Sequence, residues 1–300
     1  MKHLLKMLDF KKTELIEILD LADQLKYEQK NGIEHHQLKG KSLGMVFEKA
    51  STRTRVSFEV GMYQLGGQAL FLTSNDLQIG RGEPIEDTAR VLSRYLDGIM
   101  IRTFKQEMVE KLAEYSTIPI INGLTDFAHP CQVLADLMTI REFKSRLDGL
   151  KMAFVGDGNN MMNSLIVGGL MVGMTVSCAA PSGYEPDEKV RKYAEEQGGF
   201  MLCTNPEDAV RDADVVITDV WASMGQEGER EARFKAFQGY QVNESLMSLA
   251  KSDAMVLHCL PAHKGEEISE DVFEKNAKYI FEEAENRLHA QNAVMVKLMA

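Results

Sequence analysis

The sequence has few cysteines and no long apolar run. Its four cysteines, Cys131, Cys178, Cys203 and Cys259, are scattered without a C-x-x-C pair, which disfavours a disulfide framework and a zinc ribbon. No apolar run approaches the roughly 20 residues of a membrane-spanning helix. The N-terminus lacks both the apolar core of a signal peptide and the Arg and Ser richness of a transit peptide. We therefore expect a cytoplasmic protein with reduced thiols and no membrane partner.

Basic residues are outnumbered. The chain has 34 Lys and Arg against 45 Asp and Glu, a formal net charge of −11, which argues against nucleic acid as a partner. A small anionic substrate stays compatible with this balance, because distant acidic groups are screened within a Debye length of about 8 Å. We expect Arg53, Arg55 and Arg102 to form the local cationic cluster that such a substrate requires.

Branched apolar runs alternate with amphipathic helical patterns along the chain, as in parallel α/β proteins. A helix that starts at Pro130 separates two series, and a closing helix follows near residue 284. The predicted strands are residues 42–48, 68–72, 98–102 and 118–122, then 150–155, 174–179, 215–218, 254–258 and 279–281. With 300 residues and 44% hydrophobic content, we predict two doubly wound parallel-sheet α/β domains with the active site in the cleft between them.

Residues 51–55 read Ser-Thr-Arg-Thr-Arg and lie between a predicted strand and a predicted helix. A helix N-terminus carries unpaired N–H groups and partial positive charge, and hydroxyl and guanidinium groups add directional donors. A solvated first turn capped by Ser or Thr is the alternative interpretation. The combination directly after a strand favours a phosphate site.

Residues 47–59, Phe-Glu-Lys-Ala-Ser-Thr-Arg-Thr-Arg-Val-Ser-Phe-Glu, resemble the carbamoyl-phosphate loop of the transcarbamoylases. The segments His-Pro-Cys-Gln at 129–132, Asp-Val-Trp-Ala-Ser-Met-Gly at 219–225 and His-Cys-Leu-Pro at 258–261 follow in the order and approximate spacing of the ornithine carbamoyltransferases. The sequence departs from many members at Ala50, where proline or a basic residue is usual.

The resemblance implies a carbamoyl-phosphate-binding domain at 1–132, completed by a C-terminal helix at 285–300, and an ornithine-binding domain at 133–284. It also implies transfer of a carbamoyl group from carbamoyl phosphate to the δ-amine of L-ornithine, giving L-citrulline and phosphate. Such an enzyme serves arginine biosynthesis or ornithine recovery, requires no cofactor and forms a homotrimer or a multiple of trimers.

The resemblance also assigns roles to individual residues. Arg102 and His129 would stabilise the developing oxyanion, while Asp219 and Cys259 would orient the amine and help to deprotonate it. Contacts to ornithine are implied for Asn160, Asp219, Ser223 and Met224. Contacts to carbamoyl phosphate are implied for Ser51, Thr52, Arg53, Thr54, Gln78, Arg102, His129, Gln132, Cys259, Leu260 and Arg287, with Gln78 reaching the site of a neighbouring subunit.

Simpler interpretations stay open for single residues. Arg102 could extend from its strand end to water, and His129 could be a surface residue at a helix start. Asp219 could cap a turn, and Cys259 could be an inert thiol at a strand end.

Other chemistries are disfavoured. The Gly156-x-Gly158 turn begins like a dinucleotide fingerprint, but Met161 fills the third glycine position and no acidic residue ends the next strand. The histidines and cysteine of residues 258–263 have no second Cys/His cluster nearby in the sequence, so we expect no metal. A covalent role for Cys259 is disfavoured because an amine can attack carbamoyl phosphate directly.

The acceptor depends on Asp219. A carboxylate suits a substrate with a free ammonium group, which favours ornithine over an N-acylated ornithine and leaves putrescine as the alternative. Asn160 and the turn at 223–225 would bind an α-amino carboxylate that putrescine lacks. A non-catalytic phosphate-binding module is the remaining function class.

Overall fold

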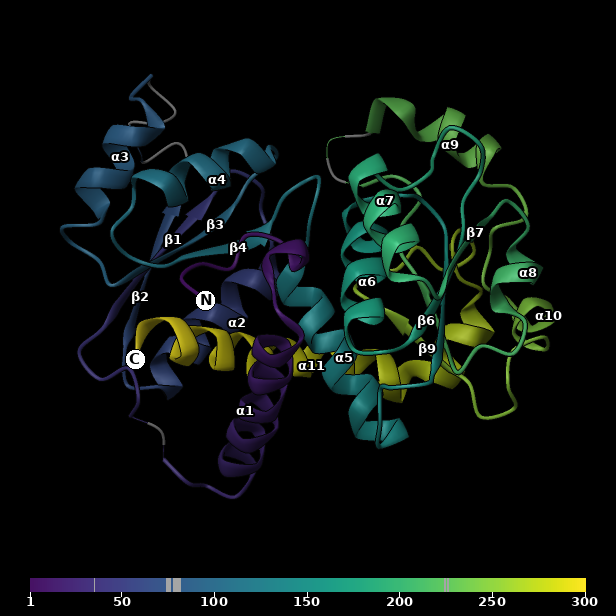
Figure 1. The fold of residues 1–300 in the computed structure, drawn as a ribbon, viewed down its shortest axis with the longest axis horizontal. Coiled ribbons are helices and arrows are strands. Elements are labelled where there is room, and N and C mark those ends of the chain that lie inside the picture. The colour runs from purple at the N-terminus through teal and green to yellow at the C-terminus, as the bar shows by residue number, and fades with distance from the viewer. Residues whose placement is uncertain (35, 74–76, 78–81, 224, 226) are drawn as a thin grey trace. The chain divides into compact units, whose positions relative to one another are not determined.

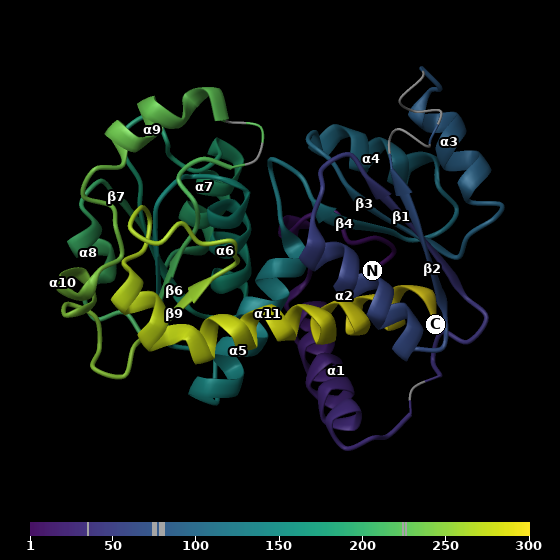
Figure 2. The same ribbon diagram turned by 180° about the vertical axis from the view of Figure 1, so that it is seen from behind.

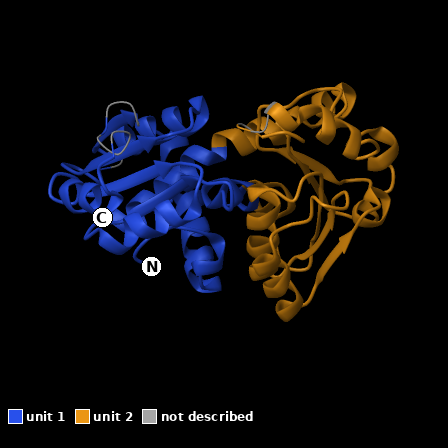
Figure 3. Ribbon diagram, turned by 90° about the horizontal axis from the view of Figure 1, so that it is seen from above, with its two compact units in different colours: residues 1–138, 286–300 blue, residues 139–285 orange. Residues whose placement is uncertain are grey.

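The computed structural model describes residues 1–300 except 35, 74–76, 78–81, 224 and 226. The chain divides into two compact units, shown in Figure 3. Unit 1 comprises Met1–Met138 and Asn286–Ala300, and unit 2 comprises Thr139–Glu285. Each unit is built on one parallel sheet with helices on its faces, which confirms the predicted α/β class.

In unit 1, the described residues form a four-stranded parallel sheet in the order β2-β1-β3-β4. Its strands are β1 (Ser42–Phe47), β2 (Gln68–Thr73), β3 (Gly98–Arg102) and β4 (Ile120–Leu124). All five residues of β3 are buried, as expected for a strand covered on both faces.

Two sets of helices cover this sheet. Apolar residues of α3 (Ile85–Leu92) and α4 (Gln106–Tyr115) pack on one face, against Val46, Ile99 and Ile101. On the other face, α2 (Thr52–Gln64) lies beside the C-terminal part of α11 (Glu270–Met299), as Figure 2 shows. The N-terminal segment adds η1 (Met7–Asp9) and α1 (Lys12–Lys30), which is tied to α11 by the Lys297–Glu17 ion pair at 2.6 Å.

In unit 2, the described residues form a five-stranded parallel sheet in the order β7-β6-β5-β8-β9. Its strands are β5 (Lys151–Val155), β6 (Thr175–Ala179), β7 (Phe200–Cys203), β8 (Val215–Thr218) and β9 (Met255–His258). One face packs on α8 (Pro206–Val210), α10 (Glu244–Met247) and the N-terminal part of α11 through a shared apolar cluster.

The remaining helices of unit 2 are α6 (Asn160–Met171), α7 (Glu188–Gln197), η3 (Glu227–Glu229) and α9 (Arg230–Ala236). Figure 1 shows α6 and α7 side by side along the sheet. Helix α5 (Pro130–Lys144) begins at Pro130 as predicted, with residues 130–138 in unit 1 and 139–144 in unit 2.

The predicted set of strands is wrong at two places. Residues 279–281 are not a strand but lie within α11, where Phe273, Asn276, Ile280 and Glu283 are buried at helical spacing. A run of three apolar residues is too short to distinguish a strand from the buried stripe of a helix. The strand β7 was missed because Phe200–Cys203 is a run of four apolar residues without polar alternation, and in the structure three of them are half-buried and one is exposed.

The registers of the sheets bring the candidate site residues together within each unit. In unit 1, Phe47 at the end of β1 is the partner of Arg102 at the end of β3. In unit 2, Thr218 at the end of β8 is the partner of His258 at the end of β9. Because parallel strands end at the same edge, the residues that follow them gather there.

Gly158 shows how closely the turn after β5 is packed. Its N–H donates to the carbonyl of Tyr184 at 2.8 Å. A Cβ atom at this position would overlap the backbone of Glu185 and Pro186. Close approach of the neighbouring backbone therefore requires a glycine at this position.

We predict that Gly158→Ala lowers the free energy of unfolding by about 1–3 kcal/mol, because backbone atoms cannot yield as a flexible side chain can. The urea midpoint of unfolding measures the loss. Gly228→Ala is the matched control, since a Cβ there meets nothing within 4 Å. Equal midpoints for the two variants would contradict the packing argument.

Candidate active site

The N-terminus of α2 carries the predicted phosphate loop. Ser51 is the N-cap, and its Oγ accepts the N–H of Thr54 at 3.2 Å and lies 3.1 Å from the Thr54 Oγ1. The first turn of α2, whose residues are all described, contains no acidic side chain. The turn thus presents hydroxyl groups and Arg53 at the positive end of the helix, without a competing carboxylate.

Arg55 does not join the cationic cluster that the sequence suggested. It is exposed, its Nε donates to Glu59 Oε1 at 3.1 Å, and its guanidinium lies 3.7 Å from the centroid of the Phe71 ring. These partners hold it on the surface of α2 and β2. The loop's contribution to the cluster is therefore Arg53.

Arg287 of α11 links three elements of unit 1. Its Nη1 donates to Gln132 Oε1 at 2.9 Å, and its Nη2 donates to Thr54 Oγ1 at 3.0 Å. Gln132 Nε2 in turn donates to Asp136 Oδ1 at 2.9 Å. All four side chains are buried. The network fixes the orientation of the Gln132 amide and holds α11 against α2 and α5.

His129 lies at the start of α5 and is only 4% exposed. Burial lowers its pKa well below the ordinary value, and the positive charges of Arg287, Arg102 and Arg53 lower it further. The imidazole is therefore neutral at pH 7 and serves as a hydrogen-bonding group without adding charge. Arg102, at the end of β3, is 7% exposed. Guanidinium groups grouped around a neutral histidine are suited to a small, highly charged anion.

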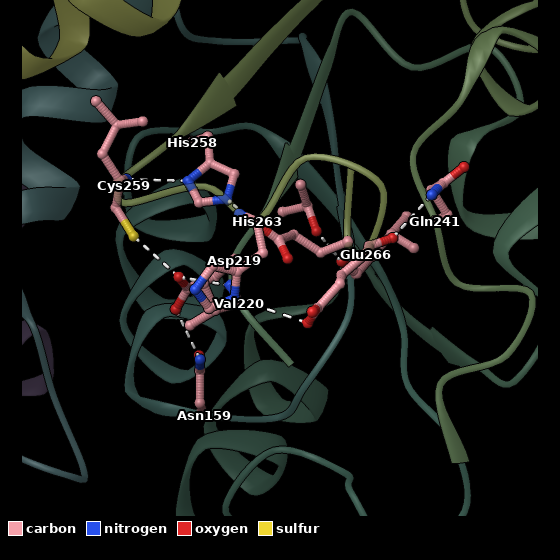
Figure 4. Close-up of polar contacts among 12 residues, drawn as sticks. Asn159, Asp219, Val220, Gln241, His258, Cys259, His263 and Glu266 are labelled. Carbon is pink, nitrogen blue, oxygen red and sulfur yellow. Dashed lines mark hydrogen bonds and ion pairs between the residues drawn. The ribbon is translucent and has the colours of Figure 1, made fainter. Parts of the chain in front are cut away.

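In unit 2, Asp219 is the centre of a hydrogen-bonded group at the ends of β5, β8 and β9. Its Oδ1 accepts the thiol of Cys259 at 3.1 Å and the N–H of Val220 at 2.8 Å. Its Oδ2 accepts Asn159 Nδ2 at 2.8 Å. Figure 4 shows these three donors converging on the carboxylate. The carboxylate is thereby fixed as an acceptor beside the thiol.

Asn159 is a site residue that the sequence analysis missed in favour of Asn160. As the N-cap of α6 it accepts the N–H groups of Met161 and Met162 through Oδ1, while its amide group reaches Asp219. An asparagine directly before an apolar helix was the available signal. Asn160 is the half-buried first residue of α6, and its contact with a substrate stays a prediction.

Asp157 and Arg233 form a second feature that the sequence did not reveal. Arg233 Nη1 donates to Asp157 Oδ2 at 2.8 Å and to the carbonyl of Trp221 at 3.0 Å. Burial raises the pKa of Asp157 to about 6, although Arg233 opposes the rise. The pair joins the turn after β5 to the segment that follows Asp219. Its partners lie 76 residues apart, so no local pattern could predict it.

The turn after β9 is held by the His258 ring. Its Nδ1 accepts the N–H of Leu260 at 2.9 Å, and its Nε2 lies 3.0 Å from Glu267 Oε1. Leu260 has a φ of 59°, in the left-handed region that is unfavourable for a residue with a Cβ. The ring bond at its N–H secures this conformation.

Two groups of described residues bring potential metal ligands within 4.8 Å of one another: Asp219, His258 and Cys259, and His263, Glu266 and Glu267. In the first group, both ring nitrogens of His258 have protein partners, so ligation would break the bond to Leu260 or to Glu267. In the second group, Glu266 already accepts Arg230 at 2.6 Å. That no metal is needed stays a prediction.

Several predicted contacts are not tested by this geometry. Gln78 and Met224 lie outside the described residues. Thr52 is exposed, and Ser223 and Leu260 are half-buried. Their contacts with a substrate stay predictions.

The cysteines and helices agree with two sequence expectations. All four cysteines are free thiols, and burial raises the pKa of Cys131 to about 12. Among the helices of the described residues, none has the length and apolar character needed to cross a bilayer.

Two family models match the chain. Residues 2–142 match the model described as "Aspartate/ornithine carbamoyltransferase, carbamoyl-P binding domain". Residues 148–298 match the model described as "Aspartate/ornithine carbamoyltransferase, Asp/Orn binding domain". The boundary between the matches falls near that between the two units, within or just after α5.

Similar proteins are found over the full length. The ornithine carbamoyltransferase of Pelobacter propionicus is 56% identical over 300 residues, covering 99% of this chain and 98% of the relative. The solved ornithine carbamoyltransferase of Pyrococcus furiosus has a TM-score of 0.95 and 53% identity, covering 99% of this chain and 97% of that one. The solved anabolic ornithine carbamoyltransferase of Campylobacter jejuni has a TM-score of 0.94 and 45% identity, covering 99% of both.

The lowered pKa of His129 predicts a pH-dependent stability. In the unfolded chain this histidine binds a proton below about pH 6.5, whereas in the folded chain it stays neutral to much lower pH. Stability should therefore fall as pH falls through 6.5, by at most about 1.4 kcal/mol per pH unit from this residue, and stay level above it.

His129→Gln should reduce this dependence, so that the loss of stability from pH 8 to pH 5 is about 2 kcal/mol smaller than in the wild type. Urea unfolding at the two pH values measures it. His36→Gln, at an exposed position, should retain the wild-type dependence. The same dependence of stability on pH in His129→Gln and the wild type would contradict this prediction. It would show that His129 takes up a proton in the folded chain as readily as in the unfolded chain.

Proposed function

We propose that this chain, which belongs to the aspartate/ornithine carbamoyltransferase family, is an enzyme. It transfers a carbamoyl group from carbamoyl phosphate to the δ-amine of L-ornithine. The products are L-citrulline and phosphate. The observation that carries the proposal is the pair of complementary groups: a cationic cluster around a neutral histidine in unit 1, and a fixed carboxylate beside a thiol in unit 2.

The cationic cluster suits carbamoyl phosphate. Ser51, Thr52, Arg53 and Thr54 at the N-terminus of α2 bind the phosphate group and stabilise its negative charge as it leaves. Arg102 and His129 stabilise the negative charge that develops on the carbamoyl oxygen. A neutral His129 can donate a hydrogen bond to that oxygen without first losing or gaining a proton.

Gln132 and Arg287 also contact carbamoyl phosphate. Their mutual hydrogen bond at 2.9 Å orients the amide that contacts the carbamoyl group. Because Thr54 and Asp136 hold the two ends of this network, the groups are positioned before the substrate arrives, which lowers the cost of reorganisation during the reaction.

The carboxylate of Asp219 suits the amine. Ornithine reaches the enzyme as a cation, and its δ-ammonium must lose a proton before nitrogen can attack. Asp219 and Cys259 contact this group, orient it and help to remove the proton. The nitrogen then bonds to the carbamoyl carbon as the bond to the phosphate oxygen breaks. Asn160, Ser223 and Met224 bind the α-amino carboxylate.

The two halves of the chain divide these tasks. We assign carbamoyl phosphate to residues 1–132 with 285–300, and ornithine to residues 133–284. Cys259 contacts carbamoyl phosphate and the attacking amine, and Leu260 contacts carbamoyl phosphate. The descriptions of the two matching families support this division. Both groups of residues serve one reaction.

The biological setting is proposed from the resemblance. The enzyme forms a homotrimer or a multiple of trimers in the cytoplasm and serves arginine biosynthesis or ornithine recovery, with Gln78 reaching the site of a neighbouring subunit. The reaction needs no cofactor, because carbamoyl phosphate is already an activated donor.

An acceptor panel tests the function. With carbamoyl phosphate as donor, L-ornithine should give citrulline, while putrescine should react with a kcat/KM lower by about a hundredfold or more, because it lacks the α-carboxylate. Colorimetric detection of the ureido product measures both rates. Equal rates would favour the putrescine alternative, and no product with either amine would contradict a transferase.

Arg53→Ala tests the phosphate loop, with Arg55→Ala as the matched control from the same turn. Loss of a charge-assisted contact should lower kcat/KM for carbamoyl phosphate by about thirtyfold or more, or about 2–5 kcal/mol. Arg55 is held by Glu59 and Phe71, so its removal should change kcat/KM little. Similar effects of the two substitutions would show that the loop acts only through its general charge.

A further inference from the structure

We propose that Glu267 is a positioning residue for the amine end of the site, acting through His258 on Leu260 and Cys259. The inference rests on the proposed function, because it concerns the geometry of the same Asp219 and Cys259 pair. No motif in the sequence pointed to Glu267, which lies in the polar segment after His263.

Glu267 is fully buried, with 0% exposure. Its Oε1 accepts the N–H of His263 at 2.6 Å and faces His258 Nε2 at 3.0 Å. His258 is also fully buried. A buried carboxylate requires compensation by hydrogen bonds or opposite charge. Here the hydrogen bonds come from His258 and His263, at the end of β9 and in the turn after it.

The hydrogen bonds define the protonation of His258. The N–H of Leu260 donates to Nδ1, so Nδ1 cannot carry a proton. The ring proton is therefore on Nε2, which donates it to Glu267. A charged imidazolium would turn a second donor toward the Leu260 N–H. Glu267 thus selects the one tautomer that can hold Leu260.

Leu260 transmits this constraint to Cys259. Its φ of 59° is unfavourable for a residue with a side chain, and the bond from its N–H to the ring stabilises it. On the other side, the N–H of His258 donates to Glu283 Oε2 at 2.8 Å. Cys259 is therefore held between two fixed residues, with its thiol 3.1 Å from Asp219 Oδ1. Figure 4 shows the Cys259 thiol directed at the Asp219 carboxylate.

The contacts of Glu267 are concentrated on one oxygen. Among the residues that the structure describes, Glu267 Oε2 has no hydrogen-bond partner. The contacts with His258 and His263 are both made by Oε1, which therefore sets the direction of the His258 ring.

The main test is Glu267→Met, which is close to glutamate in size but has no oxygen to accept the N–H groups of His258 and His263. We expect kcat for citrulline formation to fall between about tenfold and a hundredfold, because a small displacement of the reacting groups has an effect of that size. The adjacent Glu266→Met is the matched control. Glu266 is half-buried and bonded to Arg230, not to His258, so its kcat should stay within about twofold of wild type.

A double-mutant cycle separates positioning from general destabilisation. In His258→Asn, the amide oxygen occupies the place of Nδ1 and can accept the Leu260 N–H, but the contact with Glu267 is lost. If Glu267 acts through His258, adding Glu267→Met to His258→Asn should lower kcat little further. Effects that multiply would overturn the proposal, as would a wild-type kcat for Glu267→Met. His258→Asn alone also breaks the contact, so the test does not depend on the folding of Glu267→Met.

Alkylation of Cys259 supplies a readout that does not depend on catalysis. Iodoacetamide labelling followed by peptide mass spectrometry should show faster modification of Cys259 in Glu267→Met than in the wild type, because the thiol is no longer held against Asp219. Cys203, half-buried in the same unit, is the internal reference and should not change. An unchanged ratio of the two rates would overturn the proposal. Absence of citrulline from the wild-type enzyme would instead overturn the proposed function, and the labelling ratio would still decide the role of Glu267.

Discussion

The register of parallel strands is the constraint on which both groups of site residues depend. Parallel pairing places Phe47 beside Arg102 and Thr218 beside His258, so the segments after these strands begin at a common edge. Short turns after β1 and β5 then lead to Ser51, the N-cap of α2, and to Asn159, the N-cap of α6. Helix N-termini with side-chain caps stand where the chemistry is proposed, because in a parallel sheet each strand must be followed by a crossover.

The two units carry opposite charges at their candidate site residues. Unit 1 collects guanidinium groups and lowers the pKa of His129, so that the His129 ring adds no proton equilibrium of its own near pH 7. Unit 2 offers a carboxylate with hydrogen bonds to both oxygens. The overall charge of −11 is therefore irrelevant to the anion, because buried neighbours at short range outweigh a screened surface.

The sequence predicts those features that depend on local pattern. Strand β3 and strand β8 have the predicted bounds, since a continuous apolar run between polar turns leaves little choice. The error at residues 279–281 arose where three apolar residues fitted two periods equally well. Arg55 could not be separated from Arg53 by sequence, because its position depends on Phe71, a contact across two elements.

The site was predictable mainly where a motif carried it. Asp219 and Cys259 were assigned by resemblance, and the structure adds the 3.1 Å contact that joins them. Asn159 and Arg233 were missed because their roles rest on partners distant in the chain, whereas Glu267 has partners nearby, His258 and His263, but lies in no recognised motif. Hydrogen bonds across 60 or 76 residues have no signature in a single sequence.

Asn159 performs two tasks with one side chain. Its oxygen caps α6, and its nitrogen fixes Asp219. A substitution here would therefore alter the capping of a helix and the orientation of the Asp219 carboxylate together. Under the role proposed for Asp219, a change of acceptor amine made through Asn159 would need another cap for α6 as well.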